Sequence, residues 1–159
     1  MNLGVPYASL GQFLEHWDGV RYVTLRLLDS FSDDDLSYRM WTGSRTVGEF
    51  FHHIGGHQYF GACGVLLGRW EPQSGEVDED WETHRALVTS SVSHLGAWLT
   101  LTQEQLHSWA ELAPKNALCD LRQDLPWHEG LRGWAQLQHA FQDEVHHRGQ
   151  LYVAARLLG

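Results

Sequence analysis

The C-terminal stretch DEVHHRGQLYVAARLLG, Asp143 to Gly159, decides the fold, because it continues a run of apolar residues with helical spacing. Apolar side chains recur every three or four positions from this stretch back to about Leu131, which is the period of an amphipathic helix. We therefore predict a last helix over residues 131–158. Its buried stripe is expected to contain Leu137, Phe141, Val145, Leu151, Tyr152, Ala155 and Leu158.

Three earlier segments show the same period. The first covers residues 7–31 and the third covers residues 82–101, with Thr102 and Gln105 spaced as a capping signal for one or two further turns. The second begins where Thr46 and Glu49 have the spacing of a capping box, and it runs to about Leu67. This second segment is rich in glycine, which we interpret as a sign of close helix packing.

The connections complete the predicted architecture. Residues 68–82 form an acidic, turn-rich connection, and residues 110–130 form an irregular excursion with room for a short extended pair. Four long helices without a convincing strand predict an all-α protein, a four-helix bundle with an irregular excursion before the last helix. At 159 residues, the chain is expected to form a single domain over residues 1–159.

Composition narrows the classes of partner. The formal net charge of −9 repels phosphate backbones, so we expect no nucleic-acid partner. The sequence has neither a signal-peptide pattern nor an apolar run long enough to cross a bilayer, so we expect a cytoplasmic protein with no membrane partner. Cys63 and Cys119 lack metal-site spacing and are interpreted as small buried residues.

Asp143 and His147 form a two-point clamp on the predicted last helix. At about 100° per residue, these two positions lie within about 40° of each other, so one ion could touch both. His146 is rotated by about 100° from His147 and is expected to be structural. Glu144 borders the clamp, where a supporting or interface role fits. The plainer alternative is an exposed hydrogen-bonded Asp–His pair.

A second histidine cluster strengthens the metal interpretation. In FFHHIGGHQYF, Phe50 to Phe60, His53 and His57 are also four residues apart on an otherwise apolar helix. Buried imidazoles are costly unless they bond something, and facing helices of bundles build metal sites from such inward side chains. The two clusters together therefore indicate a metal site between the second and last helices.

The whole chain resembles the DinB/YfiT-like superfamily of metal-dependent four-helix-bundle proteins, which includes bacterial thiol-dependent transferases. The resemblance rests on SYRMWTGSRTVGEFFHHIGGHQYF, LTQEQL and DEVHHRGQLYVAARLLG. In that family, three histidines usually hold a divalent ion, one on the second helix and two on the last. The resemblance implies His53 and His147 as ligands, with Asp143 at the position of the family's middle histidine. His57 is the reserve ligand.

This resemblance also implies a chemistry. A divalent transition metal (nickel, zinc, manganese or iron) is expected at His53, Asp143 and His147, and the carboxylate favours harder ions such as manganese over nickel. The implied function is a metal-dependent thiol (S-)transferase acting on a small electrophilic or stress-derived compound, with a low-molecular-weight thiol as partner. The alternatives are a metal-dependent hydrolase and a non-catalytic dimeric bundle with a degenerate or structural metal site. In each case we expect a homodimer, because a glycine-rich second helix and a broad apolar first helix suit a self-complementary interface.

Residues around the proposed site have expected supporting roles. Arg148 is expected to pair with Glu144 or Glu49, and Gly149 to permit close helix contact. His139 lies one turn before Asp143 and is expected to be a surface or core histidine, with the mouth of the site as the alternative.

Overall fold

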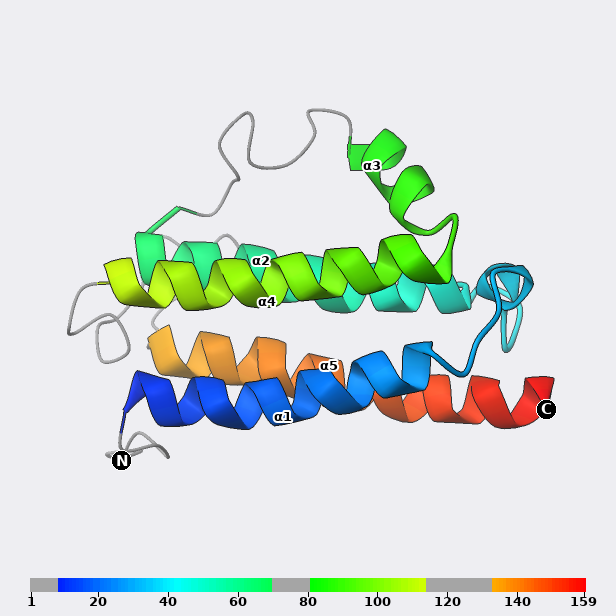
Figure 1. Ribbon diagram of the computed structural model, residues 1–159, viewed down its shortest axis with the longest axis horizontal. Coiled ribbons are helices and arrows are strands. Elements are labelled where there is room, and N and C mark those ends of the chain that lie inside the picture. Colours follow the sequence, from blue (N-terminus) through cyan, green and yellow to red (C-terminus); the bar gives the residue numbers. More distant parts are fainter. Residues whose placement is uncertain (1–8, 70–80, 114–132) are drawn as a thin grey trace.

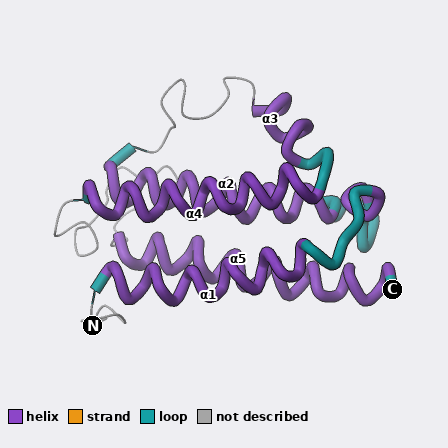
Figure 2. Tube along the Cα trace, in the orientation of Figure 1, coloured by secondary structure: helices purple, strands orange, loops and turns teal. Residues whose placement is uncertain are grey.

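The computed structural model describes residues 9–69, 81–113 and 133–159, and these residues fold into a helical bundle (Figure 1). Four long helices run side by side, and a short helix and a single 3₁₀ turn lie at their ends. No strand occurs in these three ranges (Figure 2), where Arg39 and Thr46 form an isolated antiparallel bridge. The elements are α1 (Leu10–Leu28), η1 (Asp34–Ser37), α2 (Val47–Leu67), α3 (Trp81–Val88), α4 (Val92–Leu112) and α5 (Gly133–Leu158).

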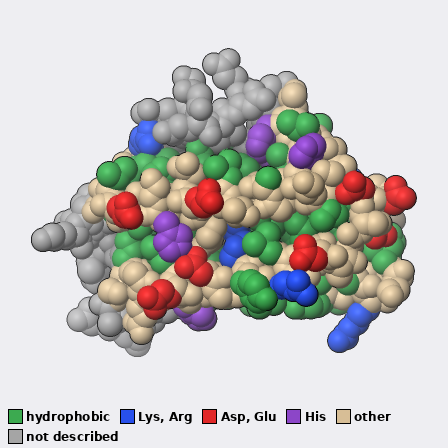
Figure 3. Space-filling model, viewed as in Figure 1, with side chains coloured by type: hydrophobic (Ala, Val, Ile, Leu, Met, Phe, Trp, Pro, Cys, Tyr) green, Lys and Arg blue, Asp and Glu red, His purple; other side chains and the backbone are tan. Residues whose placement is uncertain are grey.

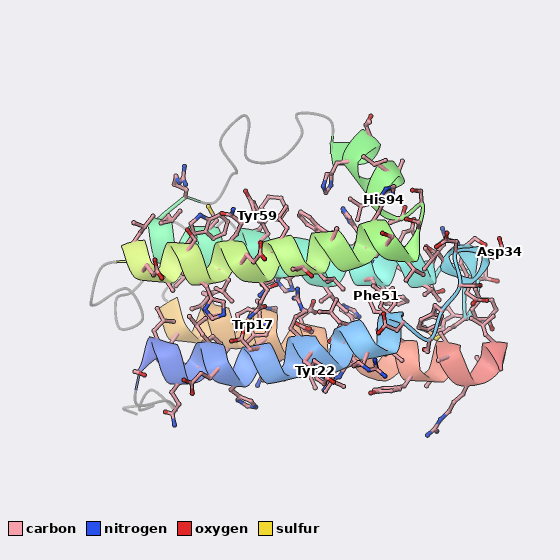
Figure 4. All side chains as sticks on the ribbon, viewed as in Figure 1. Trp17, Tyr22, Asp34, Phe51, Tyr59 and His94 are labelled. Carbon is pink, nitrogen blue, oxygen red and sulfur yellow. The ribbon has the colours of Figure 1, made fainter. Side chains whose placement is uncertain are left out.

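The four long helices form two layers, α2 with α4 and α1 with α5 (Figure 1). The helices α1 and α5 run in one direction, and α2 and α4 run in the other. The helix α2 is the centre of the bundle, with its most extensive contacts to α4 and α5. In Figure 4, Trp17 points between the layers while Tyr22 points outward from α1. None of the helices in the described ranges is long and apolar enough to cross a membrane.

The ends and the packing of α2 confirm its sequence signals. Thr46 accepts a hydrogen bond from the Glu49 amide, and the Glu49 side chain accepts one from the Thr46 amide, which completes the predicted capping box. Gly68 ends the helix with a left-handed backbone, φ 69°, that favours glycine. Close packing occurs at Gly55, where an added Cβ would lie 2.7 Å from Cδ1 of Trp98. Cys63 is buried, as predicted.

The prediction of a single third helix over residues 82–101 was wrong, because two helices, α3 and α4, cover this region. The chain leaves the helical path after Val88, where Thr89 and Ser90 hydroxyls donate to the carbonyls of Arg85 and Leu87. Ser91 then caps α4 by accepting from the His94 amide. These hydroxyls offer the backbone an alternative to helix bonding, which explains the break. Further helical turns do follow Thr102, as predicted, but Thr102 does not cap them, since it is buried inside the continuous helix α4.

The buried stripe of α5 also differs from the prediction. Leu137, Phe141 and Leu151 are buried as expected, but Val145, Tyr152 and Leu158 are exposed. Their places in the core are taken mainly by Ala140, Glu144, His147 and Ala154. A stripe sought through apolar residues alone misses two positions where a charged or titratable side chain is buried.

Glu144 lies in the core, away from the site that it was expected to border. Its carboxylate accepts hydrogen bonds from Arg21 Nε at 3.0 Å, Arg21 Nη2 at 3.0 Å, Trp17 Nε1 at 2.8 Å and Thr24 Oγ1 at 2.7 Å, all on α1. Burial by itself raises the pKa of the Glu144 carboxyl, but the Arg21 charge and these bonds outweigh it and hold the pKa below its usual range. This buried ion pair ties α5 to α1.

Two further predictions for α5 were wrong. Arg148 donates to the carbonyl of Val20 on α1 at 3.0 Å, and it ion-pairs with neither of the two proposed acids. Gly149 is exposed, and a Cβ added there would meet nothing within 4 Å among the described residues, so it serves no close helix contact. The predicted excursion is described only at its start, since residues 114–132, including Cys119, lie outside the described ranges.

Candidate metal centre

The facing sides of α2 and α5 bring the two histidine clusters together. His53 and His57 lie one turn apart on α2, and Asp143 and His147 lie one turn apart on α5. Because the two helices are antiparallel, His53 lies beside His147, and His57 lies beside Asp143. The rings of His53 and His147 are 4.9 Å apart between centroids, and His57 contacts the ring of His139 at 5.3 Å.

Asp143 is the centre of this group, because three imidazoles converge on its carboxylate. Its Oδ2 lies 2.8 Å from Nδ1 of His57 and 3.3 Å from Nε2 of His53, and its Oδ1 lies 3.3 Å from Nε2 of His147. The four side chains range from one-tenth to one-third exposed. The plainer alternative of an exposed Asp–His pair therefore does not describe the arrangement.

The carboxyl of Asp143 is held in its ionised form. Burial alone raises its pKa, but the hydrogen bonds from His147, His53 and His57 outweigh burial and keep the pKa well below its usual range. The site therefore offers a fixed negative charge surrounded by imidazole nitrogens.

His147 is oriented by a residue whose role the sequence did not reveal. Its Nδ1 lies 2.6 Å from Oε1 of Gln150, one turn further along α5. An amide oxygen can only accept, so Nδ1 donates to Gln150, and in the protonated ring Nε2 donates to Asp143. Burial lowers the pKa of His147, but its bonds to Asp143 and Gln150 outweigh burial, and the resulting pKa is raised.

The donor set fits a divalent transition metal. One ring nitrogen each from His53 and His57 and one oxygen of Asp143 lie within 4.8 Å of one another, a spacing that an ion could bridge after small side-chain movements. Two imidazoles and a carboxylate with further positions open suit zinc, iron, nickel or manganese. His147 adds a fourth donor on the other oxygen of Asp143. The reserve residue His57 lies closer to the carboxylate, at 2.8 Å, than the predicted ligands His53 and His147, each at 3.3 Å.

The remaining sequence candidates lie outside the group. His146 is exposed and contacts the ring of His147 at 5.1 Å, and His139 is exposed beside His57. Glu144 faces Arg21 instead of the histidines. Because each residue on α5 is rotated by about 100° from the one before it, Asp143 and His147 face the group while their neighbours Glu144 and His146 do not.

A cavity of about 680 Å³ opens beside the histidines, along α2. His53 and His57 contribute to its wall, as does Glu49 one turn before them. Three arginines also line it, and sequence reasoning missed them because they lie in loops and on the short α3, where no periodic pattern marks them: Arg39, Arg45 and Arg85. Figure 3 shows one face of the molecule, over which acidic side chains are scattered.

The fold and the site define a helical bundle with a His/His/Asp group between two antiparallel helices. Residues 6–159 match the model of the DinB family, so the chain belongs to the DinB family. The resemblance seen in the sequence motifs is thereby confirmed.

Solved structures agree with this assignment. A DinB-like protein from Bacillus subtilis aligns with a TM-score of 0.73 and 25% identity, covering 93% of this chain and 92% of the other. A DinB-like protein from Bacillus cereus aligns with a TM-score of 0.69 and 19% identity, covering 96% and 95%. No curated protein matches the sequence.

Proposed function

We propose that this protein is a metal-dependent thiol (S-)transferase whose metal is held by His53, Asp143 and His147. The observation that carries the proposal is the convergence of three imidazoles on one ionised, partly buried carboxylate, with two of these imidazoles, His53 and His57, at the wall of a cavity. A bound divalent ion lowers the pKa of a coordinated thiol or water and so supplies a nucleophile near neutral pH. The substrate is a small electrophile, which fits a cavity of about 680 Å³.

The protein's own residues have distinct tasks in this proposal. Gln150 fixes the tautomer of His147 so that Nε2 faces Asp143, as the outer partners of metal-binding histidines commonly do. His57 donates from Nδ1 to Asp143, which leaves its Nε2 as an acceptor for the proton that the thiol loses.

Metal analysis tests the site directly. The protein is purified without a histidine tag, and its metal content is measured together with that of the His53→Ala, Asp143→Ala, His57→Ala and His147→Ala variants. We expect about one ion per chain in the wild type and a large loss for His53→Ala and Asp143→Ala. The comparison of His57→Ala with His147→Ala identifies the third ligand. Occupancy indifferent to all four changes would refute the site.

Thiol dependence separates the transferase from its alternatives. The metal-loaded protein is expected to accelerate conjugation of a small thiol to monochlorobimane, and the acceleration is expected to disappear in EDTA and in Asp143→Ala. Turnover of a p-nitrophenyl ester without thiol would instead favour the hydrolase. Metal binding without either activity, in a protein that sediments as a dimer, would favour the non-catalytic homodimer.

A further inference from the structure

We propose that the arginine-lined end of the cavity is a subsite for an oxyanion, a carboxylate or phosphate group carried by the small-molecule substrate or by the thiol. Arg45 is its principal residue, supported by Arg39 and Arg85. This inference rests on the proposed function, because the same ligand would place its reacting atom at the His53–Asp143 group.

The charge of the cavity wall runs against the charge of the protein. Three of the chain's eleven Lys and Arg residues line this one cavity, whereas the chain as a whole has a net charge of −9. Among the described residues, Glu49 is the one acidic residue on the same wall. A cavity with an excess of guanidinium groups concentrates anions, and the acidic remainder of the surface repels them elsewhere.

The three arginines are not equivalent. Glu49 holds two of them at the wall, with its carboxylate 3.2 Å from Nη1 of Arg39 and 3.7 Å from Nη1 of Arg85. Arg39 also donates to the carbonyl of Ser44. Arg45 is exposed, and its side chain makes no hydrogen bond or ion pair with the described part of the chain. Its planar fork of donors is therefore available for bidentate binding of an oxyanion.

The spacing along α2 fixes the size of a ligand that would use both ends. Glu49, His53 and His57 follow one another at intervals of four residues, which is about 6 Å along a helix for each interval. Arg39 and Arg85 lie beside Glu49, and Arg45 lines the same cavity, so the oxyanion and the reacting atom should be separated by roughly 6–12 Å. An extended chain of about five to ten bonds spans this range.

The far end of the cavity also shows that it is built to hold a ligand. Gln136 lines the cavity two turns before Asp143 on α5, and its side chain is 6% exposed. Its amide Nε2 is buried and has no hydrogen-bond partner among the described residues. Unpaired buried donors are uncommon because they are costly, so this one points to an acceptor supplied by a bound molecule.

Two matched thiols test the oxyanion subsite. Binding of 6-mercaptohexanoate and of uncharged 6-mercaptohexanol is measured by calorimetry on the full chain, metal-free and loaded with Zn²⁺. We expect the acid to bind about tenfold more tightly than the alcohol, with or without Zn²⁺, because the arginines do not depend on the metal. Displacement of the acid by inorganic phosphate would extend the subsite to phosphates, and its absence would restrict it to carboxylates.

Variants assign the effect to the arginine. Arg45→Gln is expected to reduce the acid-to-alcohol affinity ratio at least threefold, Arg45→Lys to retain part of it, and Arg156→Gln, an equal change of charge outside this cavity, to leave it unaltered. A ratio near one in the wild type, or one that Arg156→Gln lowers as much as Arg45→Gln, would overturn the subsite. Failure of Zn²⁺ to strengthen binding of either thiol would instead count against the proposed function.

Discussion

At the scale of single residues, Asp143 distinguishes this site from the three-histidine pattern of the family that the sequence resembles. In the structure, the Asp143 carboxylate contacts three imidazoles, and their hydrogen bonds keep it ionised. A carboxylate adds a negative charge and a hard oxygen, so it should favour manganese relative to nickel.

Replacing Asp143 by histidine tests this choice of ligand. Asp143→His is expected to raise the ratio of nickel affinity to manganese affinity by about tenfold or more, since imidazole suits the softer ion. Titration calorimetry with each metal gives the ratio. Asp29→His, which places a histidine at an exposed position of the surface, is the control and should leave the ratio as in the wild type. An unchanged ratio in Asp143→His would contradict the assignment of this residue as a ligand.

His52, next to the site on α2, makes stability depend on pH. Its ring stacks on Trp98 with centroids 5.6 Å apart and lies 3.4 Å from His84. Burial, and then the neighbouring charges of His84 and Arg85, lower its pKa from 6.5 to about 4. Between these two values the unfolded chain binds a proton that the folded chain does not, so folding is less favourable as the pH falls from 6.5 to 4.

The size of this effect follows from the pKa difference. At 1.36 kcal/mol per pH unit, the free energy of unfolding should decrease by roughly 3 kcal/mol over this interval because of His52. Urea unfolding of the metal-free protein at several pH values measures it. His52→Phe preserves a ring on Trp98 and removes the titration, so the pH slope of the variant should be smaller. Parallel curves for the two proteins would show that His52 does not titrate in this way.

The candidate site was predictable from sequence where helical geometry decides it. The four-residue spacings of His53 with His57 and of Asp143 with His147 place each pair on one helix face, and the structure brings the pairs together. The destination of Glu144 was missed, although Arg21, four residues after Trp17 on the apolar stripe of α1, was a signal for a buried partner. The arginines of the cavity gave no such signal, because their meeting depends on loops.

At the scale of elements, the two kinds of helix glycine can be distinguished by what surrounds them. Gly55 faces Trp98, whose Nε1 also donates to the carbonyl of His52 at 3.1 Å, so the close approach of α2 and α4 depends on the missing side chain. Gly149 faces solvent on α5. The sequence predicts both as packing residues, and tertiary contacts alone separate them.

Alanine at each position should therefore act in opposite directions. Gly55→Ala forces the Trp98 ring to move and is expected to destabilise the protein by about 2–4 kcal/mol, from overpacking and a lost hydrogen bond. Gly149→Ala is expected to stabilise it by up to about 1 kcal/mol, because alanine is the better helix former and meets no neighbour. The midpoints of urea unfolding compare the two. Equal stability of Gly55→Ala and the wild type would exclude close packing at this glycine.

Helix boundaries were predictable where the caps are local. The capping box at Thr46 and the glycine after Leu67 mark both ends of α2, and the structure confirms them. The break between α3 and α4 was not predicted, since the apolar period continues across Thr89, Ser90 and Ser91 and hides the hydroxyl bonds that end one helix and cap the next.

At the scale of the whole molecule, one buried charge network joins all four long helices. Arg21 of α1 is paired with Glu144 of α5, donates from Nη1 to Leu99 and Thr102 of α4, and donates from Nη2 to Gln58 of α2. Each polar group in this network has a partner, so the low dielectric of the core strengthens the bonds instead of penalising unpaired atoms. The network is next to the candidate metal centre in sequence, but Glu144 faces α1, because each residue on α5 is rotated by about 100° from the one before it.

Removing one partner of this network should lower the free energy of unfolding far more than removing both charges. Arg21→Met leaves the Glu144 carboxylate buried without its cation and is expected to destabilise the protein by about 3–5 kcal/mol. In the double variant Arg21→Met with Glu144→Gln, the amide oxygen can accept from Trp17 and the amide nitrogen can donate to the Thr24 hydroxyl without a buried charge, so part of the loss should be recovered. Urea unfolding of both single variants and the double variant gives the coupling energy.

Arg26→Met, which removes a cation from an exposed pair with Asp29, is the control and should lower the free energy of unfolding by about 0–1 kcal/mol. Strict additivity of the two core substitutions would show that the helices are held together by apolar packing alone and that the buried ion pair is energetically incidental.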